Sequence, residues 1–174
     1  MAQNRLLWML ALPVVLVLFV WLDPFGSPSG LGPAADKEVA DIALTGPVVD
    51  RADILTADQE KILTRKLLGF QRTTDHQMVV VTVSTLQSAP IERFTDALGN
   101  NWRIGRKGHD DGIVLLVAPN QGQVRLAVGD GLKSELPDAL CKSIIERDLI
   151  PRFRTGDDYA AIIAGVDAVV RRLD

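Results

Sequence analysis

The sequence predicts an α/β protein: a three-layer αβα sandwich around a small mixed sheet, with one N-terminal transmembrane helix. Three observations carry this prediction. Helix-like and strand-like patterns alternate along the chain. A β-branched run and two apolar runs joined by a short turn supply the strands. A stretch of consecutive apolar residues, Leu6–Leu22, precedes all of them.

The apolar stretch Leu6–Leu22 is long enough to cross a membrane. Its residues, at about 1.5 Å each, just span a hydrocarbon core of roughly 30 Å. Trp8 and Trp21 suit the two interfaces, and no clear cleavage site follows promptly. Of a cleaved signal peptide and an uncleaved anchor, we therefore favour an anchor over residues 1–23. Arg5 before it predicts a single-pass membrane protein with an extracytoplasmic domain, periplasmic or lumenal.

The rest of the chain divides into a linker and one domain. Residues 24–37 are rich in Gly, Pro and Ser and are predicted to be a flexible linker. Residues 38–174 are long enough for a hydrophobic core of their own. The formal net charge of −3 gives no electrostatic signature of nucleic-acid binding. The single cysteine, Cys141, excludes an intrachain disulfide and falls in an apolar helical pattern.

The first half of the domain alternates helix and strand. Thr56 and Gln59 form a capping box, which predicts a helix from this point. Gln77–Ser84 is a β-branched, nearly continuous apolar run and is typical of a central strand covered on both faces. Pro90 opens a second helix, which ends near Asn100–Asn101. The apolar stripe of the first helix comprises Ile62, Leu63, Leu67 and Phe70.

A hairpin follows the second helix. Two short apolar runs, Gly112–Ala118 and Gln123–Gly129, are separated by a turn at Pro119–Gly122. The turn sets a register in which Ala118 faces Gln123 and Gly112 faces Gly129. This register buries matched apolar pairs on one face, and a slip of one residue would separate them.

Two helices complete the predicted domain. Leu136–Asp148 reads as a helix that Pro151 interrupts, with Leu140, Ile144 and Ile145 facing inward. Asp157 or Asp158 caps the last helix, whose apolar residues are Ile162, Ile163, Val166, Val169 and Val170.

The open end of the hairpin carries the most distinctive chemistry. One step beyond the Gly112–Gly129 pair, Asp111 faces Asp130, and Asp110 adds a third carboxylate. Opposed like charges repel, so this end of the hairpin favours a cation. Hard ions such as Ca²⁺ or Mg²⁺ take carboxylate and carbonyl oxygens. The alternative interpretation is that these aspartates are solvated residues of Gly-rich turns.

Other chemistries have weaker support. No phosphate-binding loop, nucleophile elbow or cysteine pair is present, so no catalytic residue is predicted. His76 and His109 lie in different segments, which disfavours a zinc site. His109 beside Asp110 is compatible with acid–base chemistry, but a solvated loop histidine explains it better. The basic residues Arg103, Arg106 and Lys107 suit a phosphate or an acidic partner, or simply a solvated loop.

The chain resembles the TPM domain family from about Val48 to Leu173. Several short motifs occur in the family's order. They are Val49-Asp50-x-Ala52 with Leu55; Val79–Val83; Trp102-x-Ile104-Gly105-x-Lys107; Asp110-Asp111-Gly112-x-x-Leu115-Leu116-Val117-Ala118; Val128-Gly129-x-Gly131-Leu132; and Ile150-Pro151-x-Phe153 followed by Gly165-Val166-Asp167-Ala168.

The resemblance implies an αβα sandwich tethered to a membrane, with divalent-cation binding by an acidic cluster. Carried over by position, that cluster is Asp50, Asp110 and Asp111. Two residues depart from the family pattern: Asp130 stands where an aromatic residue is common, and Asp111 where Asn is frequent. Together with the hairpin register, this gives a predicted metal site of Asp50, Asp110, Asp111 and Asp130.

The predicted function is that of a membrane-anchored, extracytoplasmic TPM-like domain that binds Ca²⁺ or Mg²⁺. The resemblance implies a role in assembly, repair or quality control of membrane protein complexes, with such a complex as the partner. The alternative function is a metal-assisted acid phosphatase, acting on phosphomonoesters. The third hypothesis is a scaffold that binds no ligand.

Overall fold

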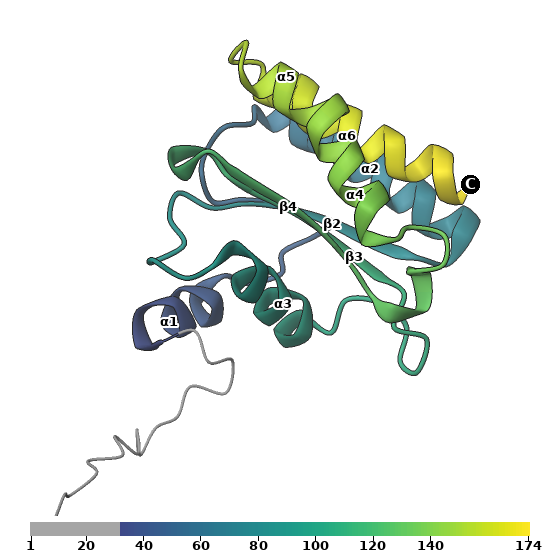
Figure 1. Ribbon diagram of the computed structural model, residues 1–174, viewed down its shortest axis with the longest axis horizontal. Helices are drawn as coiled ribbons and strands as arrows, with labels where there is room; N and C mark the ends of the chain where they lie inside the picture. The colour runs from purple at the N-terminus through teal and green to yellow at the C-terminus, as the bar shows by residue number, and fades with distance from the viewer. Residues whose placement is uncertain (1–31) are drawn as a thin grey trace, which may run out of the picture.

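The computed structural model describes residues 32–174, which form a mixed sheet with helices on both of its faces (Figure 1). The predicted anchor, residues 1–23, and the first part of the predicted linker lie outside these residues. Among the residues that are described, no helix is both long and apolar enough to cross a membrane.

The sheet has four strands in the order β1-β2-β3-β4. They are β1 (Val48–Asp50), β2 (Gln77–Thr82), β3 (Gly112–Ala118) and β4 (Gln123–Val128). β1, β2 and β3 run parallel, and β4 is antiparallel to β3. The mixed sheet is therefore confirmed. β1 was not predicted as a strand, because its three residues are too few to show a period.

The hairpin register is confirmed. Ala118 pairs with Gln123 and Ile113 with Val128, and the ladder continues to a 2.9 Å bond from Gly129 N to Gly112 O. The turn contains a short 3₁₀ helix, η1 (Pro119–Gln121). Beyond the ladder the chain does not continue as a strand but turns into a second 3₁₀ helix, η2 (Asp130–Leu132). This turn decides where the predicted site residues point.

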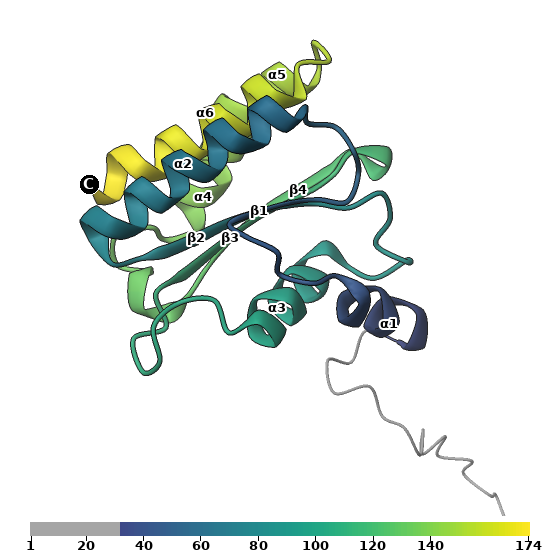
Figure 2. The same cartoon turned by 180° about the vertical axis from the view of Figure 1, so that it is seen from behind.

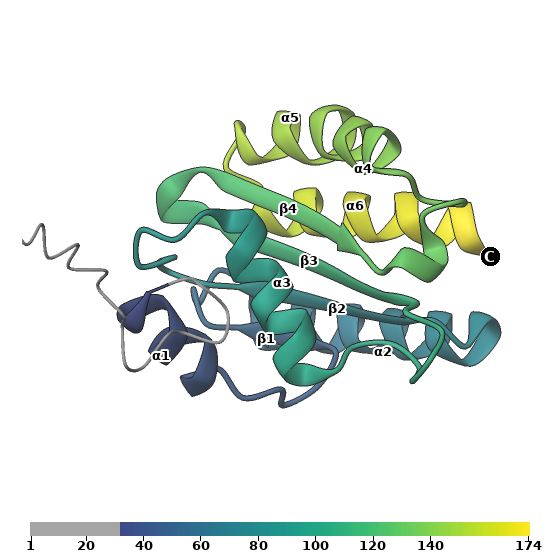
Figure 3. The same ribbon diagram turned by 60° about the horizontal axis from the view of Figure 1, so that its bottom comes forward.

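The helices form two layers, one on each face of the sheet (Figures 1 and 2). α2 (Ala57–Thr74), α4 (Asp138–Ile144), α5 (Ile150–Phe153) and α6 (Asp158–Leu173) cover one face. α1 (Pro33–Asp41) and α3 (Ile91–Trp102) cover the other, as Figure 3 shows from below. Two apolar cores fill the layers, and successive residues of β3 alternate between them.

Two local predictions need correction. Ile62 was placed on the buried stripe of α2, but it is 43% exposed, while its neighbours Leu63 and Leu67 are buried. The linker was predicted to extend to residue 37, but Pro33–Asp41 is helical. Ala35 and Val39 of this helix are buried in the core with α3, and the Trp102 indole donates a 3.0 Å hydrogen bond to Ile42 O. Tertiary docking thus outweighs the local Gly/Pro-rich composition.

The helix predicted to break at Pro151 runs through it. α4 continues into a π-helical turn, η3 (Ile145–Leu149), and then into α5. Pro151 has no N–H, and in a regular α-helix its ring would clash with the carbonyl of Arg147. The wider π turn accommodates the proline, and the Ile150 N–H bonds to Ile145 O.

Candidate functional site

The structure separates the four predicted metal ligands into three places. Asp110 and Asp130 line one cavity at the open end of the β3–β4 hairpin. Asp111, the next residue in the chain, is buried in a different network of contacts. Asp50 ends β1, and its strand partner Thr82 aligns with Val117 near the end of β3, whereas Asp111 precedes the start of β3. Asp50 therefore lies at the opposite end of the sheet.

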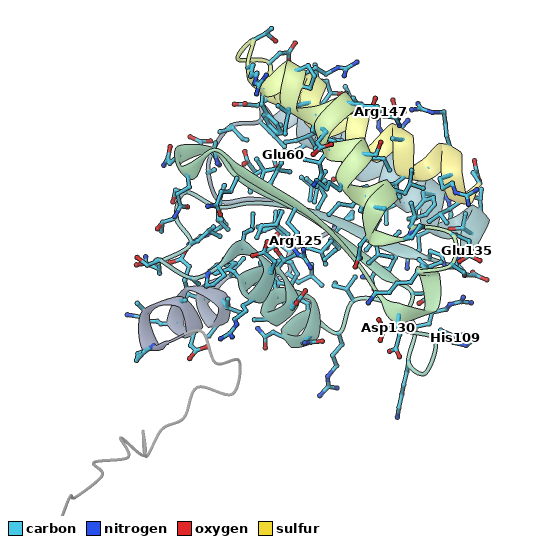
Figure 4. All side chains as sticks on the ribbon, in the orientation of Figure 1. Glu60, His109, Arg125, Asp130, Glu135 and Arg147 are labelled. Atoms are coloured by element: carbon cyan, nitrogen blue, oxygen red, sulfur yellow. The ribbon has the colours of Figure 1, made fainter. Side chains whose placement is uncertain are left out.

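We call the cavity that contains Asp110 and Asp130 the hairpin cavity. It has a volume of about 530 Å³ and lies between β4, α3 and the loops that flank η2. Figure 4 shows Arg125 between β4 and α3, and Asp130 at the loop end. The charged residues that line the hairpin cavity are Asp96, Asp110, Arg125, Asp130, Lys133 and Asp138. Four aspartates against one arginine and one lysine give the lining a formal net charge of −2.

Ion pairs occupy part of this lining. Lys133 Nζ lies 2.7 Å from Asp130 Oδ1, and Arg125 contacts Asp96 loosely at 3.9 Å. The hydrogen bond and charge of Asp130 raise the pKa of Lys133, with smaller contributions from Asp138 and Asp96. In return, the hydrogen bond and charge of Lys133 lower the pKa of Asp130. Lys133 and Arg125 are thus each held beside one carboxylate of the lining.

Asp110 is a carboxylate of the cavity that no ion pair occupies. Its backbone is in the left-handed region with φ 48°, and its side chain is exposed. Within residues 32–174, its carboxylate makes no hydrogen bond or ion pair. An exposed aspartate without a partner beside an acidic cavity is free to bind a cation or to remain solvated.

The glycines around the hairpin end allow the preceding loop to pack closely against it. A Cβ at Gly129 would lie 2.0 Å from Asp110 O, and one at Gly131 would lie 1.9 Å from His109 O. The Gly131 N–H bonds to Asp110 O at 3.0 Å. The carbonyls of Asp110 and His109 thus approach these two glycines closely, which fixes the loop that carries Asp110.

Asp111 points to the other face of the sheet, toward the α2 layer. It is 2% exposed, and its Oδ2 lies 3.1 Å from His76 Nδ1 and 2.7 Å from Arg106 Nε. Its Oδ1 accepts a 2.6 Å hydrogen bond from the Arg106 backbone N–H. The His76 ring is packed beside Phe70 of α2, and Arg106 also reaches Asp75 at 3.8 Å. Both oxygens of Asp111 therefore have protein partners.

These contacts keep Asp111 ionised. Burial raises the pKa of the Asp111 carboxyl, but the hydrogen bonds from the Arg106 backbone, the Arg106 side chain and His76 outweigh it and lower the pKa to about 2. A buried carboxylate with this many donors is a structural anchor for residues 106–111.

Asp50 has a similar structural role at the far end of the sheet. One carboxylate oxygen accepts a 2.8 Å hydrogen bond from the Leu55 N–H, and the other accepts from the Thr82 hydroxyl. Thr82 is fully buried, and its hydroxyl also accepts from the Ala52 N–H at 3.0 Å. Asp50 therefore holds together the loop between β1 and α2.

The donor set of the hairpin cavity fits a hard cation in part. Its carboxylate oxygens are of the type that Ca²⁺ and Mg²⁺ prefer, and both Asp110 and Asp130 are accessible. Among residues 32–174, however, no group of three or more His, Cys, Asp or Glu side chains is placed to hold a metal ion. Two predicted ligands, rather than four, share this cavity, and the binding of a cation stays a prediction.

Several residues of both regions were not predicted from the sequence. Asp96, Arg125, Lys133 and Asp138 come from separate elements and meet only through the fold. His76 was considered only as a zinc ligand. Its position beside Asp111 follows from the parallel register, in which Gln77 pairs with Gly112 and the preceding residues adjoin. His109 and Lys107 are exposed, as expected of a solvated loop.

The fold and site define a small αβα domain with an acidic cavity at the end of a hairpin. The TPM domain model matches residues 48–172, which is most of the chain. The chain therefore belongs to the TPM domain family, and the resemblance noted from its motifs is confirmed. No curated protein shows significant similarity to it.

Solved structures support this assignment. The N-terminal domain of a protein from P. gingivalis is 32% identical, with a TM-score of 0.70 over 85% of this chain and 91% of that one. The N-terminal domain of a Corynebacterium glutamicum protein is 12% identical (TM-score 0.60, 76% and 82% covered). The BA42 protein of Bizionia argentinensis is 16% identical (TM-score 0.60, 68% and 81% covered). The last two likenesses show the fold alone.

Proposed function

We propose that this TPM domain is a membrane-anchored, extracytoplasmic binding module that takes a divalent cation in the hairpin cavity. Its role is in the assembly, repair or quality control of membrane protein complexes. The apolar stretch Leu6–Leu22 supports the anchoring, and membership of the TPM domain family supports the rest.

One observation carries the cation proposal. Asp110 has an accessible carboxylate without a partner in the described part of the chain, and it lines a cavity whose charged groups sum to −2. Asp130 joins it when its side chain leaves Lys133, a movement that its exposure permits. Water completes the coordination of Ca²⁺ or Mg²⁺, as is common in sites with few protein ligands. Asp50 and Asp111 support the fold rather than the ion.

Calorimetric titration of the full chain with Ca²⁺ and with Mg²⁺ tests this proposal. We expect binding that Asp110→Asn and Asp130→Asn each weaken by about tenfold or more, because each removes a charge from the site. The matched control is Asp53→Asn. It removes the same charge at an exposed position with φ 55°, which Asn tolerates. An absence of binding, or equal weakening by the control, contradicts the proposal.

A second candidate function is a metal-assisted phosphomonoesterase. The observation that favours it is the pair of basic side chains, Arg125 and Lys133, in the hairpin cavity. The buried Nε of Arg125 has no hydrogen-bond partner in the described residues, and Lys133 lines the same space. Both are donors that suit a phosphoryl oxygen. A bound cation would polarise that oxygen and activate water.

Hydrolysis of an aryl phosphate by the purified chain distinguishes the two functions. A phosphatase at this site loses its activity on chelation and in both Asp110→Asn and Arg125→Gln, and keeps it in Asp53→Asn. Cation binding without any hydrolysis leaves the binding module as the function. Activity that survives both substitutions places the chemistry elsewhere.

A further inference from the structure

A second surface lies in the helical layer, on the other side of the sheet from the hairpin cavity. It is a groove of about 420 Å³ between α4 with its π turn η3 and α6. We call it the arginine groove, and it is lined by Leu140, Ile144, Arg147, Asp148, Ala168, Arg171 and Arg172.

The groove concentrates positive charge in an otherwise acidic protein. Three of its lining residues are arginines and only Asp148 is acidic, whereas the whole chain has a net charge of −3. Arg172 is positioned by a 2.9 Å hydrogen bond from its Nε to Glu135 O. Arg147 and Arg171 are exposed, and their side chains make no ion pair or hydrogen bond with any residue between 32 and 174. Their guanidinium groups are therefore available to carboxylates in a fork-like geometry.

The floor of the groove is apolar. Leu140 and Ala168 are partly exposed there, beside the buried Ile144. The π turn contributes as well, because it contains Arg147 and places it on the wall opposite Arg171 of α6. π turns within helices frequently occur at functional sites. A ligand that fits this groove combines negative charge with an apolar side chain.

The position of the groove favours a protein over a lipid surface. α1, the first described helix, covers the opposite face of the sheet from α4, α5 and α6 (Figures 1 and 3). The described part of the chain starts on that opposite face, at residue 32. An anchor joined there, as proposed above, leaves the arginine groove accessible to the exposed part of a neighbouring protein.

We propose that the arginine groove binds an acidic segment of a partner protein, with carboxylates on Arg147 and Arg171 and an apolar side chain on the floor between them. This inference rests on the interaction role proposed above and names the chemistry of the partner. It does not involve the hairpin cavity. Its test is therefore performed in the presence of a chelator, so that its result is independent of the cation titration.

Fluorescence anisotropy of a labelled peptide of glutamates around a central leucine tests the inference with the full chain. We expect saturable binding that Arg147→Glu/Arg171→Glu weakens by about tenfold or more and that higher salt weakens as well. The double variant Arg147→Gln/Arg171→Gln, which only removes the two charges, weakens peptide binding less than the charge-reversing variant does. Replacing the central leucine by glycine also reduces affinity, because the apolar contact is lost. Circular dichroism verifies that each variant is folded.

The matched control reverses the same charges elsewhere. Lys37→Glu/Lys107→Glu changes the net charge equally at two exposed lysines, on α1 and on the loop before β3. Equal weakening by this control reveals non-specific attraction and overturns the inference. It is also overturned if the peptide does not bind, or if vesicles of phosphatidylglycerol bind at the arginines while the peptide does not.

Discussion

His76 Nδ1 lies 3.1 Å from Asp111 Oδ2, which joins the start of β2 to the residue before β3. Asp111 is 2% exposed, and Arg106 completes its partners from the loop. This buried carboxylate ties α2, the sheet and residues 106–111 into one unit. Stability and loop geometry should therefore depend on it more than on the neighbouring Asp110.

Removal of the Asp111 charge should destabilise the domain. Asp111→Asn leaves the guanidinium of Arg106 and the His76 ring without their anionic acceptor, and we expect a loss of about 1–3 kcal/mol in the free energy of unfolding. Urea denaturation followed by circular dichroism measures it. Asp110→Asn is the matched control and should change stability by no more than about 0.5 kcal/mol, because its carboxylate is exposed and unpaired. Equal losses in both variants would show that Asp111 is no anchor.

The same carboxylate should make stability depend on pH. The pKa of Asp111 is lowered from 3.8 to about 2 on folding, so its stabilisation is fully present above about pH 5 and is lost as the pH falls toward 2. It amounts to about 2 kcal/mol at neutral pH. The difference in unfolding free energy between wild type and Asp111→Asn should therefore shrink between pH 5 and pH 2. A difference that stays constant over this range would contradict the assigned shift.

Gly131→Ala should disturb the hairpin cavity. Its Cβ would lie 1.9 Å from His109 O, so the loop that carries Asp110 must move. We expect a loss of about 1–3 kcal/mol in unfolding free energy and weaker cation binding. Gly46→Ala is the control, because a Cβ there meets no atom within 4 Å and its φ is not positive. An unchanged stability and affinity in Gly131→Ala would argue against the fixed loop.

Thr82→Val should separate the role of Asp50 from that of the cavity. The substitution keeps the shape of the buried side chain and removes the hydroxyl that bonds Asp50 and the Ala52 N–H. We expect a loss of about 1–3 kcal/mol in unfolding free energy, with cation affinity unchanged. A large loss of cation affinity in this variant would indicate that Asp50 is part of the cation site.

The sequence was sufficient for the features that depend on local pattern. The capping box at Thr56 and Gln59 forms as predicted, and the hairpin register follows from its apolar pairs. The direction of the hairpin's end could not be predicted. Gly129 leads into the 3₁₀ helix η2, which turns Asp130 outward to Lys133 instead of continuing the strand toward Asp111.

Long-range pairings also lay beyond sequence reasoning. The contact of His76 with Asp111 needs the parallel register of β2 and β3, and no turn fixes that register locally. The charged lining of the hairpin cavity likewise joins residues from α3, β4 and α4. The helix α1 has a weakly amphipathic sequence after a Gly/Pro-rich stretch, and its packing on α3 is a tertiary effect.

Asp110 and Asp111 are joined by a single peptide bond, yet their side chains leave the backbone toward opposite layers of the domain. The group proposed to bind a cation is thus the chain neighbour of a buried carboxylate that holds the loop in place. Asp110 is exposed, so it can change at little cost in stability, whereas a change at Asp111 disturbs the loop that carries Asp110. Variation in the proposed affinity should therefore arise at Asp110 and at Asp138, both exposed lining residues, while Asp111 is retained.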